Sequence, residues 1–183
     1  GATDVQNLRT GLYFATIQAA IDDAGTAAGD VLEVQVASHA EGICTVNKAV
    51  TIQGGGGGAV ITSTTDTGTA GDARAWFLVT VSGVTFKDLT FDGSANLIAQ
   101  ALRFHSGGTV DHCTIQHIKR TTAEYTGLAV VGFGNLTVTD CAFSDCGRIG
   151  VILYGTGVTA GVVSGCTYTG KGDGDWLDYG VEL

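Results

Sequence analysis

The sequence predicts an all-β solenoid, a parallel β-helix of about six coils with a capping α-helix at its N-terminal end. Three observations predict this fold: a strand-like segment recurs along the chain, its apolar positions align, and only one stretch has helical periodicity. The recurring segments are "FKDLTF" (86–91), "VDHCTI" (110–115), "VTDCAF" (138–143) and "VSGCTY" (163–168). The repeat of roughly 23–30 residues lies in the range of solenoid coils.

A second strand follows each of these segments. The second strands are "ALRF" (101–104), "GLAV" (127–130), "GVIL" (150–153) and "GVEL" (180–183). Because side chains alternate along a strand, stacking the repeats assigns five columns to the interior. The columns are Phe86, Val110, Val138 and Val163; Leu89, Cys113, Cys141 and Cys166; Phe91, Ile115, Phe143 and Tyr168; Leu102, Leu128, Val151 and Val181; and Phe104, Val130, Leu153 and Leu183.

One stretch, "FATIQAAIDDAG", has the period of an amphipathic helix. Its apolar residues, at spacings of three and four, are Phe14, Ile17 and Ile21. Thr16 can cap the N-terminus and Gly25 can end the helix, so we expect a capping helix within residues 13–25. The apolar face of this helix must cover another part of the chain.

The 183 residues suit one domain with a sizeable core. We therefore expect a single β-helix domain over residues 1–183. Its first coils, over 30–82, are less regular than the coils over 83–183, and its C-terminal end has no apparent cap.

The stretch "YFATIQAAIDDAGTAAGDVLEVQVASHAEGICTVNKAVTIQGGG" resembles the N-terminal cap of right-handed parallel β-helix proteins of the pectate-lyase-like superfamily. In that family a "TIQAAIDAA"-type helix plugs the first coil, and strands of the form "GD-x-I-x-V" and "V-x-K-x-V-T-I-x-G" follow. The match covers about residues 13–60, and "VASHAEG" departs from the family's "PGTY"-like turn. The resemblance implies a right-handed parallel β-helix.

The family is rich in polysaccharide lyases, esterases and hydrolases, whose signatures are missing from this chain. There is no Pro to accompany a pectate-lyase Arg, and the motifs "NTD", "GHG", "RIK", "QDT", "DFIFG" and "DPHE" do not occur. His105, His112 and His117 fall on different coils and faces, so they suggest no Ser-His-Asp arrangement. We therefore assign no catalytic residue, and the sequence leans against an enzyme.

Three of the five Cys residues share one interior column, Cys113, Cys141 and Cys166. Three stacked thiols cannot all pair, and their Cβ atoms, about 4.8 Å apart, lie further apart than a relaxed disulfide prefers. We interpret them as a ladder of small buried residues. No Cys spacing typical of a metal site accompanies them.

Composition limits the partners and the location. Nine Lys and Arg residues against 18 Asp and Glu give a net charge of −9, which disfavours nucleic acid and anionic membranes. No apolar run approaches the roughly 18 residues of a membrane span. Because the chain has no Met, we expect that residue 1 was made by processing or by truncation, and the composition fits a secreted or cell-surface β-protein.

The connections between the two strand sets predict a groove, because a short one (144–150) lies between two long ones (116–127 and 169–180). Its floor carries Asp145 and Arg148. One wall consists of Lys119, Arg120, Glu124 and Tyr125, and the other of Asp173, Asp175, Trp176 and Asp178. Aromatic and hydrogen-bonding groups suit a sugar ring, so a glycan is the expected ligand. The alternative is that both loops are only solvated.

The acidic wall also offers a weak candidate for Ca²⁺, the only cofactor that the sequence suggests. Asp173, Asp175 and Asp178 could supply the oxygen ligands that this ion prefers. The segment lacks the full twelve-residue loop of an EF-hand.

Two apolar surfaces suggest self-association. Ile152 and Tyr154 face outward, and Ala129 and Val131 are their expected neighbours in an outer stripe, unless a loop covers it. Val181 and Leu183 lie in the last coil, which has no apparent cap, and its open edge is a template for another strand. We expect either that the chain was cut from a longer β-helix, with end-to-end association as a consequence, or that another molecule covers this end.

Three functions are compatible with these patterns. The first is an extracellular scaffold or adhesion module that binds carbohydrate through its loops. The second is the N-terminal part of a polysaccharide-active enzyme. The third is a structural protein that self-assembles through its open end.

Overall fold

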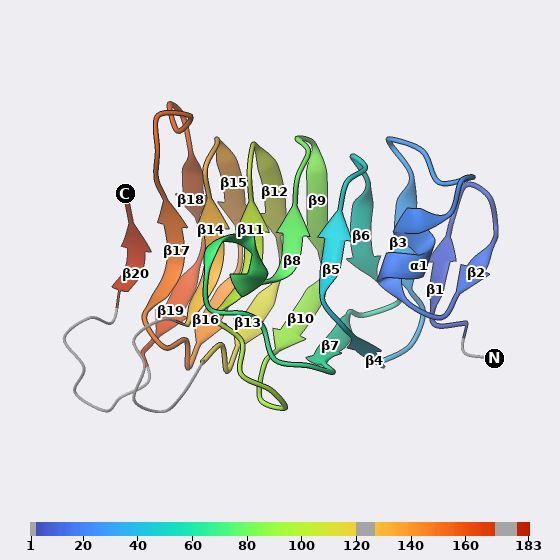
Figure 1. Ribbon diagram of the computed structural model, residues 1–183, viewed down its shortest axis with the longest axis horizontal. Helices are drawn as coiled ribbons and strands as arrows, with labels where there is room; N and C mark the ends of the chain where they lie inside the picture. Colours follow the sequence, from blue (N-terminus) through green and yellow to red (C-terminus); the bar gives the residue numbers. More distant parts are fainter. Residues whose placement is uncertain (1–2, 120–126, 171–178) are drawn as a thin grey trace.

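The computed structural model describes residues 3–119, 127–170 and 179–183, whose strands stack into three sheets around one core (Figure 1). Sheet A consists, in spatial order, of β18 (Val162–Ser164), β15 (Leu136–Thr139), β12 (Gly108–Asp111), β9 (Val84–Lys87), β6 (Thr51–Gly54), β3 (Val31–Val34), β1 (Val5–Asn7) and β2 (Tyr13–Phe14). Sheet B consists of β19 (Thr167–Thr169), β16 (Ala142–Ser144), β13 (Thr114–Gln116), β10 (Leu89–Asp92), β7 (Ala59–Ser63) and β4 (Ser38–Glu41). Sheet C consists of β20 (Tyr179–Glu182), β17 (Ile149–Leu153), β14 (Leu128–Gly132), β11 (Gln100–Phe104), β8 (Ala75–Val79) and β5 (Cys44–Val46). The helical elements are α1 (Ile17–Asp22) and the 3₁₀ turn η1 (Gly71–Arg74).

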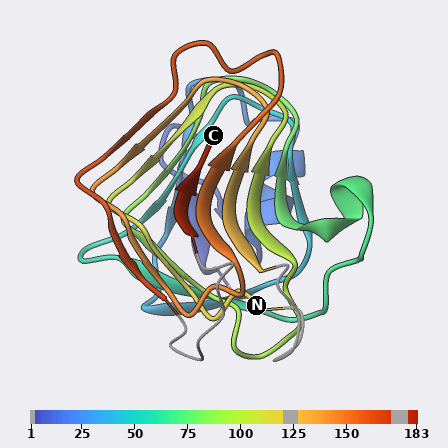
Figure 2. The ribbon, with the colours of Figure 1, turned by 90° about the vertical axis from the view of Figure 1, so that its left-hand side faces the viewer.

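The chain passes through the three sheets in turn, once per coil. Strands of successive coils pair in parallel, as β9 does with β12 and β14 with β17. Viewed toward the C-terminal end of the solenoid, the coils follow nearly the same outline around a single interior (Figure 2). The predicted all-β parallel β-helix is therefore confirmed.

A tight corner joins four strands of sheet A, β9, β12, β15 and β18, to the next strand of sheet B. The residues at this corner have positive φ angles and are Asp88 (53°), His112 (49°), Asp140 (52°) and Gly165 (65°). Glycine adopts this left-handed region freely, and Asp and His adopt it more readily than most residues. Because the corner has the same length in each of these coils, the four recurring segments align without gaps.

The interior columns of sheets A and B match the prediction. Val110 pairs with Phe86 and Val138, so their side chains stack in one column. Ile115 pairs with Phe91 and Phe143 in the same way.

The predicted register of sheet C is wrong by two residues in one strand. Leu102 pairs with Val130, where the sequence alignment places Leu128. Val130 in turn pairs with Val151, and Gly132 pairs with both Phe104 and Leu153. Since side chains alternate with a period of two, a slip of two residues keeps Val130 on its predicted interior face. The start of β14 departs from this alternation, because Ala129 belongs to the core and Leu128 is only partly buried. Periodicity alone could not reveal the slip.

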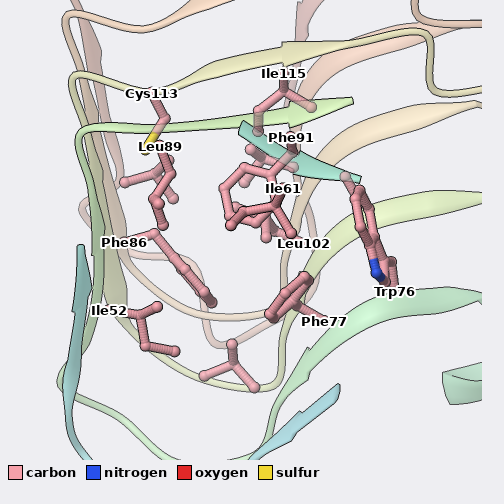
Figure 3. Close-up of a cluster of buried hydrophobic side chains, with 14 of the residues drawn as sticks. Ile52, Ile61, Trp76, Phe77, Phe86, Leu89, Phe91, Leu102, Cys113 and Ile115 are labelled. Atoms are coloured by element: carbon pink, nitrogen blue, oxygen red, sulfur yellow. The ribbon is translucent and has the colours of Figure 1, made fainter. Parts of the chain in front are cut away.

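An aromatic cluster fills the middle of the core (Figure 3). Its members are fully buried, and they are Trp76, Phe77, Phe86, Phe91 and Phe104. The ring centroids of neighbouring pairs lie 5.3–5.9 Å apart, and most pairs meet edge to face. This is the arrangement that aromatic quadrupoles favour, and each pair adds about 0.5–1.5 kcal/mol to the burial of its surface.

Helix α1 and strands β1 and β2 lie at the N-terminal end of the solenoid. Thr16 caps the helix by accepting a hydrogen bond from the Ala19 N–H at 3.0 Å, and Ile17 and Ile21 are fully buried. The helix is shorter than the predicted range of 13–25, because Tyr13–Phe14 pair with β1 as strand β2.

The free cysteines follow the expected pattern. None of the five forms a disulfide; Cys113 and Cys141 are buried, while Cys166 in the last coil is only partly covered. The interpretation of a stacked thiol ladder is confirmed.

Candidate functional site

Only part of the predicted groove lies within the described residues. Lys119 Nζ lies 2.5 Å from Asp145 Oδ1, so an ion pair joins two successive coils just after their sheet B strands, β13 and β16. Arg148 lies further along, with Nη2 4.0 Å from Glu182 Oε2. The remaining groove residues lie outside the described residues: Arg120, Glu124, Tyr125, Asp173, Asp175, Trp176 and Asp178. The same applies to the proposed Ca²⁺ ligands among them.

The outer face of sheet C carries two columns of side chains that the sequence analysis assigned differently. One column consists of Leu78, Arg103, Val131, Ile152 and Glu182. The other follows the strand ends and consists of Thr80, His105, Phe133 and Tyr154, whose backbone N–H groups donate to the neighbouring coil in the same way. These side chains form the sheet C face.

The predicted apolar stripe needs correction. Val131 does pair with Ile152, but Val131 is fully buried, and Ala129 belongs to the core. The neighbour of Tyr154 is Phe133, which follows from the two-residue slip in β14. The exposed part of the face is therefore aromatic rather than aliphatic.

Phe133 and Tyr154 form an aromatic pair on the sheet C face. Their ring centroids lie 4.4 Å apart with an interplanar angle of 58°, and Tyr154 is 42% exposed. The guanidinium carbon of Arg103 lies 4.5 Å from the centroid of the Phe133 ring, and the His105 ring lies 6.5 Å from it. A cation above a ring stabilises this geometry by roughly 0.5–1 kcal/mol at an exposed site.

Asp72 holds the side chains of Arg103 and His105 on this face. It belongs to η1, the short green helical turn that stands beside sheet C in Figure 2. Its Oδ1 lies 2.9 Å from His105 Nε2 and accepts a hydrogen bond of 2.9 Å from Arg103 Nε. The hydrogen bonds from His105 and Arg103 lower the pKa of Asp72, so this carboxyl is ionised at neutral pH.

Two hollows accompany the aromatic pair. One, of about 310 Å³, is lined by Arg103, His105 and Phe133. The other, of about 450 Å³, is lined by Tyr154 and the loop that follows it. The side chain of Asn135 holds this loop, because its Oδ1 accepts hydrogen bonds from the backbone N–H groups of Thr159 at 2.7 Å and Ala160 at 2.8 Å. The shape beside Tyr154 is therefore fixed by the fold.

A polar group lies at the corner between sheets A and B. Asp111, His112 and Asp140 offer ligand atoms within 4.8 Å of one another, the only such group in the described parts of the chain. His112 Nδ1 lies 2.8 Å from Asp111 Oδ1, and this hydrogen bond raises the pKa of His112.

The comparisons with known proteins agree with the architecture. No helix in the described part of the chain is long and apolar enough to span a membrane. Neither the curated proteins nor the solved structures contain a match to the chain. A family model described as the right-handed β-helix region matches residues 26–182. The chain therefore belongs to the right-handed β-helix family.

Proposed function

We propose that the protein is an extracellular β-helix scaffold that binds carbohydrate on its sheet C face. The observation that carries this proposal is the pair of Phe133 and Tyr154, with Arg103 and His105 beside it. Aromatic rings offer flat apolar surface to the C–H groups of a sugar, and nearby polar groups orient its hydroxyls.

The charge of the face favours a neutral glycan over a polyanionic one. Asp72 compensates the charge of Arg103, and the whole chain carries a net charge of −9. A uronic-acid polymer would meet repulsion from the protein as a whole. A neutral sugar would instead use His105 and Arg103 as hydrogen-bond donors.

The chemistry of the face favours binding without catalysis. Glycoside hydrolysis needs a carboxylic acid that is protonated at the working pH and a second carboxylate nearby. Asp72 is held ionised by its two partners, so it cannot supply the acid. The alternative function of a polysaccharide-active enzyme is therefore not supported by Asp72.

A second candidate function is self-association through the C-terminal end. Strands β18, β19 and β20 each pair with one neighbouring strand among the described residues. Val162, Val181 and Leu183 expose apolar surface at the same end. Unpaired edges with apolar side chains are templates for further strand pairing, and a second copy would supply such strands.

The carbohydrate proposal is tested by glycan-array binding and calorimetry with neutral and uronic-acid-containing oligosaccharides. The unmodified protein should bind a neutral member of the panel. Replacing Phe133 and Tyr154 together with Ala should weaken that binding by roughly tenfold or more, because two stacking surfaces are lost.

A matched control exists at the other end of the solenoid. Tyr13 is 52% exposed and contributes nothing to the sheet C face, so Tyr13→Ala should leave glycan binding unchanged. Absence of binding by the unmodified protein across the panel, or equal losses in Tyr13→Ala and the double variant, would refute the proposal.

A further inference from the structure

His39 is a buried histidine held between two carboxyl groups. It lies on β4 with its side chain 1% exposed, whereas the side chains of His105, His112 and His117 are 38%, 57% and 42% exposed. Its Nδ1 lies 3.1 Å from Asp4 Oδ2, and its Nε2 lies 3.1 Å from Glu41 Oε2. Both ring nitrogens therefore face a carboxylate oxygen.

This geometry fixes the number of protons on the ring. A carboxylate oxygen only accepts hydrogen bonds, and a neutral imidazole has one N–H donor and one acceptor nitrogen. Only the doubly protonated imidazolium of His39 donates to Asp4 and Glu41 together. Glu41 Oε2 also accepts a hydrogen bond of 2.5 Å from the Ile17 N–H.

The contacts of His39 join three segments of the N-terminal end. Asp4 directly precedes β1, Glu41 lies on β4, and Ile17 is the first residue of α1. Strand β1 and helix α1 close the first coil, since Val5, Ile17 and Ile21 have no exposed surface. The segment from residue 3 to residue 22, which includes β1, β2 and α1, is called the cap below.

We propose that His39 is a pH-sensitive clasp that holds the cap on the solenoid while its imidazole is protonated and releases it when the imidazole loses a proton. Loss of one proton leaves a ring nitrogen lone pair facing a carboxylate, so one of the two links becomes repulsive. The cap then opens more often, although the remaining coils stay stacked.

The surroundings of His39 support the direction of this switch. Burial lowers the pKa of His39, but the hydrogen bonds to Glu41 and Asp4 outweigh it and leave the pKa raised. The other titratable groups on this side are Asp22 of α1 and Cys44 of β5. Burial raises the pKa of the Cys44 thiol, and the charges of Glu41 and Asp22 raise it further. From sheet B, β7 contributes the neutral Thr62, whose hydroxyl donates to the His39 carbonyl at 3.4 Å.

The sign of the effect follows from the raised pKa. Stability from His39 is complete below the usual histidine pKa near 6.5 and is lost as the pH rises through the folded-state value. The cap should therefore be closed at pH values below the folded-state pKa of His39 and should loosen as the pH rises above it.

Nitrogen NMR of the His39 ring tests the protonation directly. We expect both ring nitrogens to be protonated below the folded-state pKa, with a titration midpoint above about 6.5. A midpoint at or below about 6.5 would overturn the proposal. This measurement uses the unmodified protein, so it does not depend on whether any variant folds.

Hydrogen exchange tests the motion of the cap. After correction for intrinsic rates, exchange in residues 3–22 should rise between pH 6 and pH 9 by about tenfold for each unit by which the pKa of His39 is raised. In His39→Gln, which carries no charge, this rise should disappear. His105→Gln, an exposed control, should keep it.

A second variant separates the clasp from general damage. In Asp4→Asn the amide can either donate or accept, so a neutral imidazole is accommodated. The pH at which the cap loosens should then move toward 6.5. The proposal would be refuted if hydrogen exchange in the cap depended on pH equally in the unmodified protein, in His39→Gln and in Asp4→Asn.

Discussion

The two ends of the solenoid are built from similar strands but differ in burial. At the N-terminal end, α1 and β1 leave Val5, Ile17 and Ile21 with no exposed surface. At the C-terminal end, Val181 is 47% exposed and Leu183 is 88% exposed. A repeat thus specifies where a side chain points, while its burial depends on having a coil or a cap on both sides.

The thiol column shows this difference within one set of equivalent positions. Cys113 and Cys141 have neighbouring coils on both sides and are buried, whereas Cys166 belongs to the last coil and is partly exposed. The column of Phe143 and Tyr168 behaves in the same way, since Phe143 is buried and Tyr168 only partly so. Equivalent substitutions along one column should therefore destabilise the protein less as the position approaches the open C-terminal end.

The largest effect is expected when a charge enters the middle of the thiol column. Cys141→Asp places a carboxylate at a buried position where the thiol now lies beside the backbone carbonyl oxygens of Val110 and Thr139. Such a change should cost more than about 4 kcal/mol and should unfold the protein or nearly so. Thermal and urea unfolding followed by circular dichroism would measure the loss.

The same substitution at the open end supplies the comparison. Cys166→Asp should be much milder, because water reaches this position, and Cys141→Ser should fall between the two. Equal destabilisation by Cys141→Asp and Cys166→Asp would show that the last coil is covered in solution.

The register of sheets A and B could be predicted from the sequence, whereas that of sheet C could not. The corner at Asp88, His112 and Asp140 has constant length, so the segments on both sides align without gaps. The connections from sheet B to sheet C differ in length from coil to coil. The sequence alignment therefore paired β11 with β14 two residues away from the observed register. Alternation could not correct this slip, because a shift of two preserves the face.

The sequence predicted an outer stripe at Ile152 and Tyr154, but it did not predict the aromatic pair of the sheet C face or the contacts of His39, because both depend on long-range contacts. Asp72 reaches His105 from a turn 33 residues upstream, and Asp4 lies 35 residues before His39. Phe133 and Tyr154 are separate strand-end aromatics in the sequence, and only the true register brings their rings together. Such sites can be predicted only when it is known which residues of different coils become neighbours, and the periodicity of the sequence does not give this information.

A smaller effect is expected from changing the polarity of the open end. Val181→Lys together with Leu183→Lys should reduce association without changing the melting temperature by more than a few degrees, since both side chains are already exposed. Light scattering over a concentration series would show the average mass rising with concentration only in the unmodified protein.

The control for this pair lies at the capped end. Leu8 and Leu12 are exposed there, so Leu8→Lys with Leu12→Lys changes the charge equally and should leave association unchanged. A monomer at every concentration, with or without the substitutions, would contradict the proposed association.

The smallest effect is expected at the helix cap. Thr16→Ala removes the oxygen that accepts from the Ala19 N–H, which should destabilise α1 by about 1 kcal/mol. Thr16→Ser keeps the hydroxyl and should behave like the unmodified protein. Because α1 has six residues, it is stable only through packing on the first coil, so weakening it should release the whole cap.

Hydrogen exchange resolves where that loss appears. If the two ends are independent, Thr16→Ala should raise exchange by roughly fivefold in residues 3–22 and leave β14 and β17 unchanged, since solenoid stability is a sum of local terms. Equal increases in all coils would mean that the solenoid opens as one cooperative unit. The N-terminal cap would then stabilise the sheet C face as well, and cap opening would weaken glycan binding several coils away.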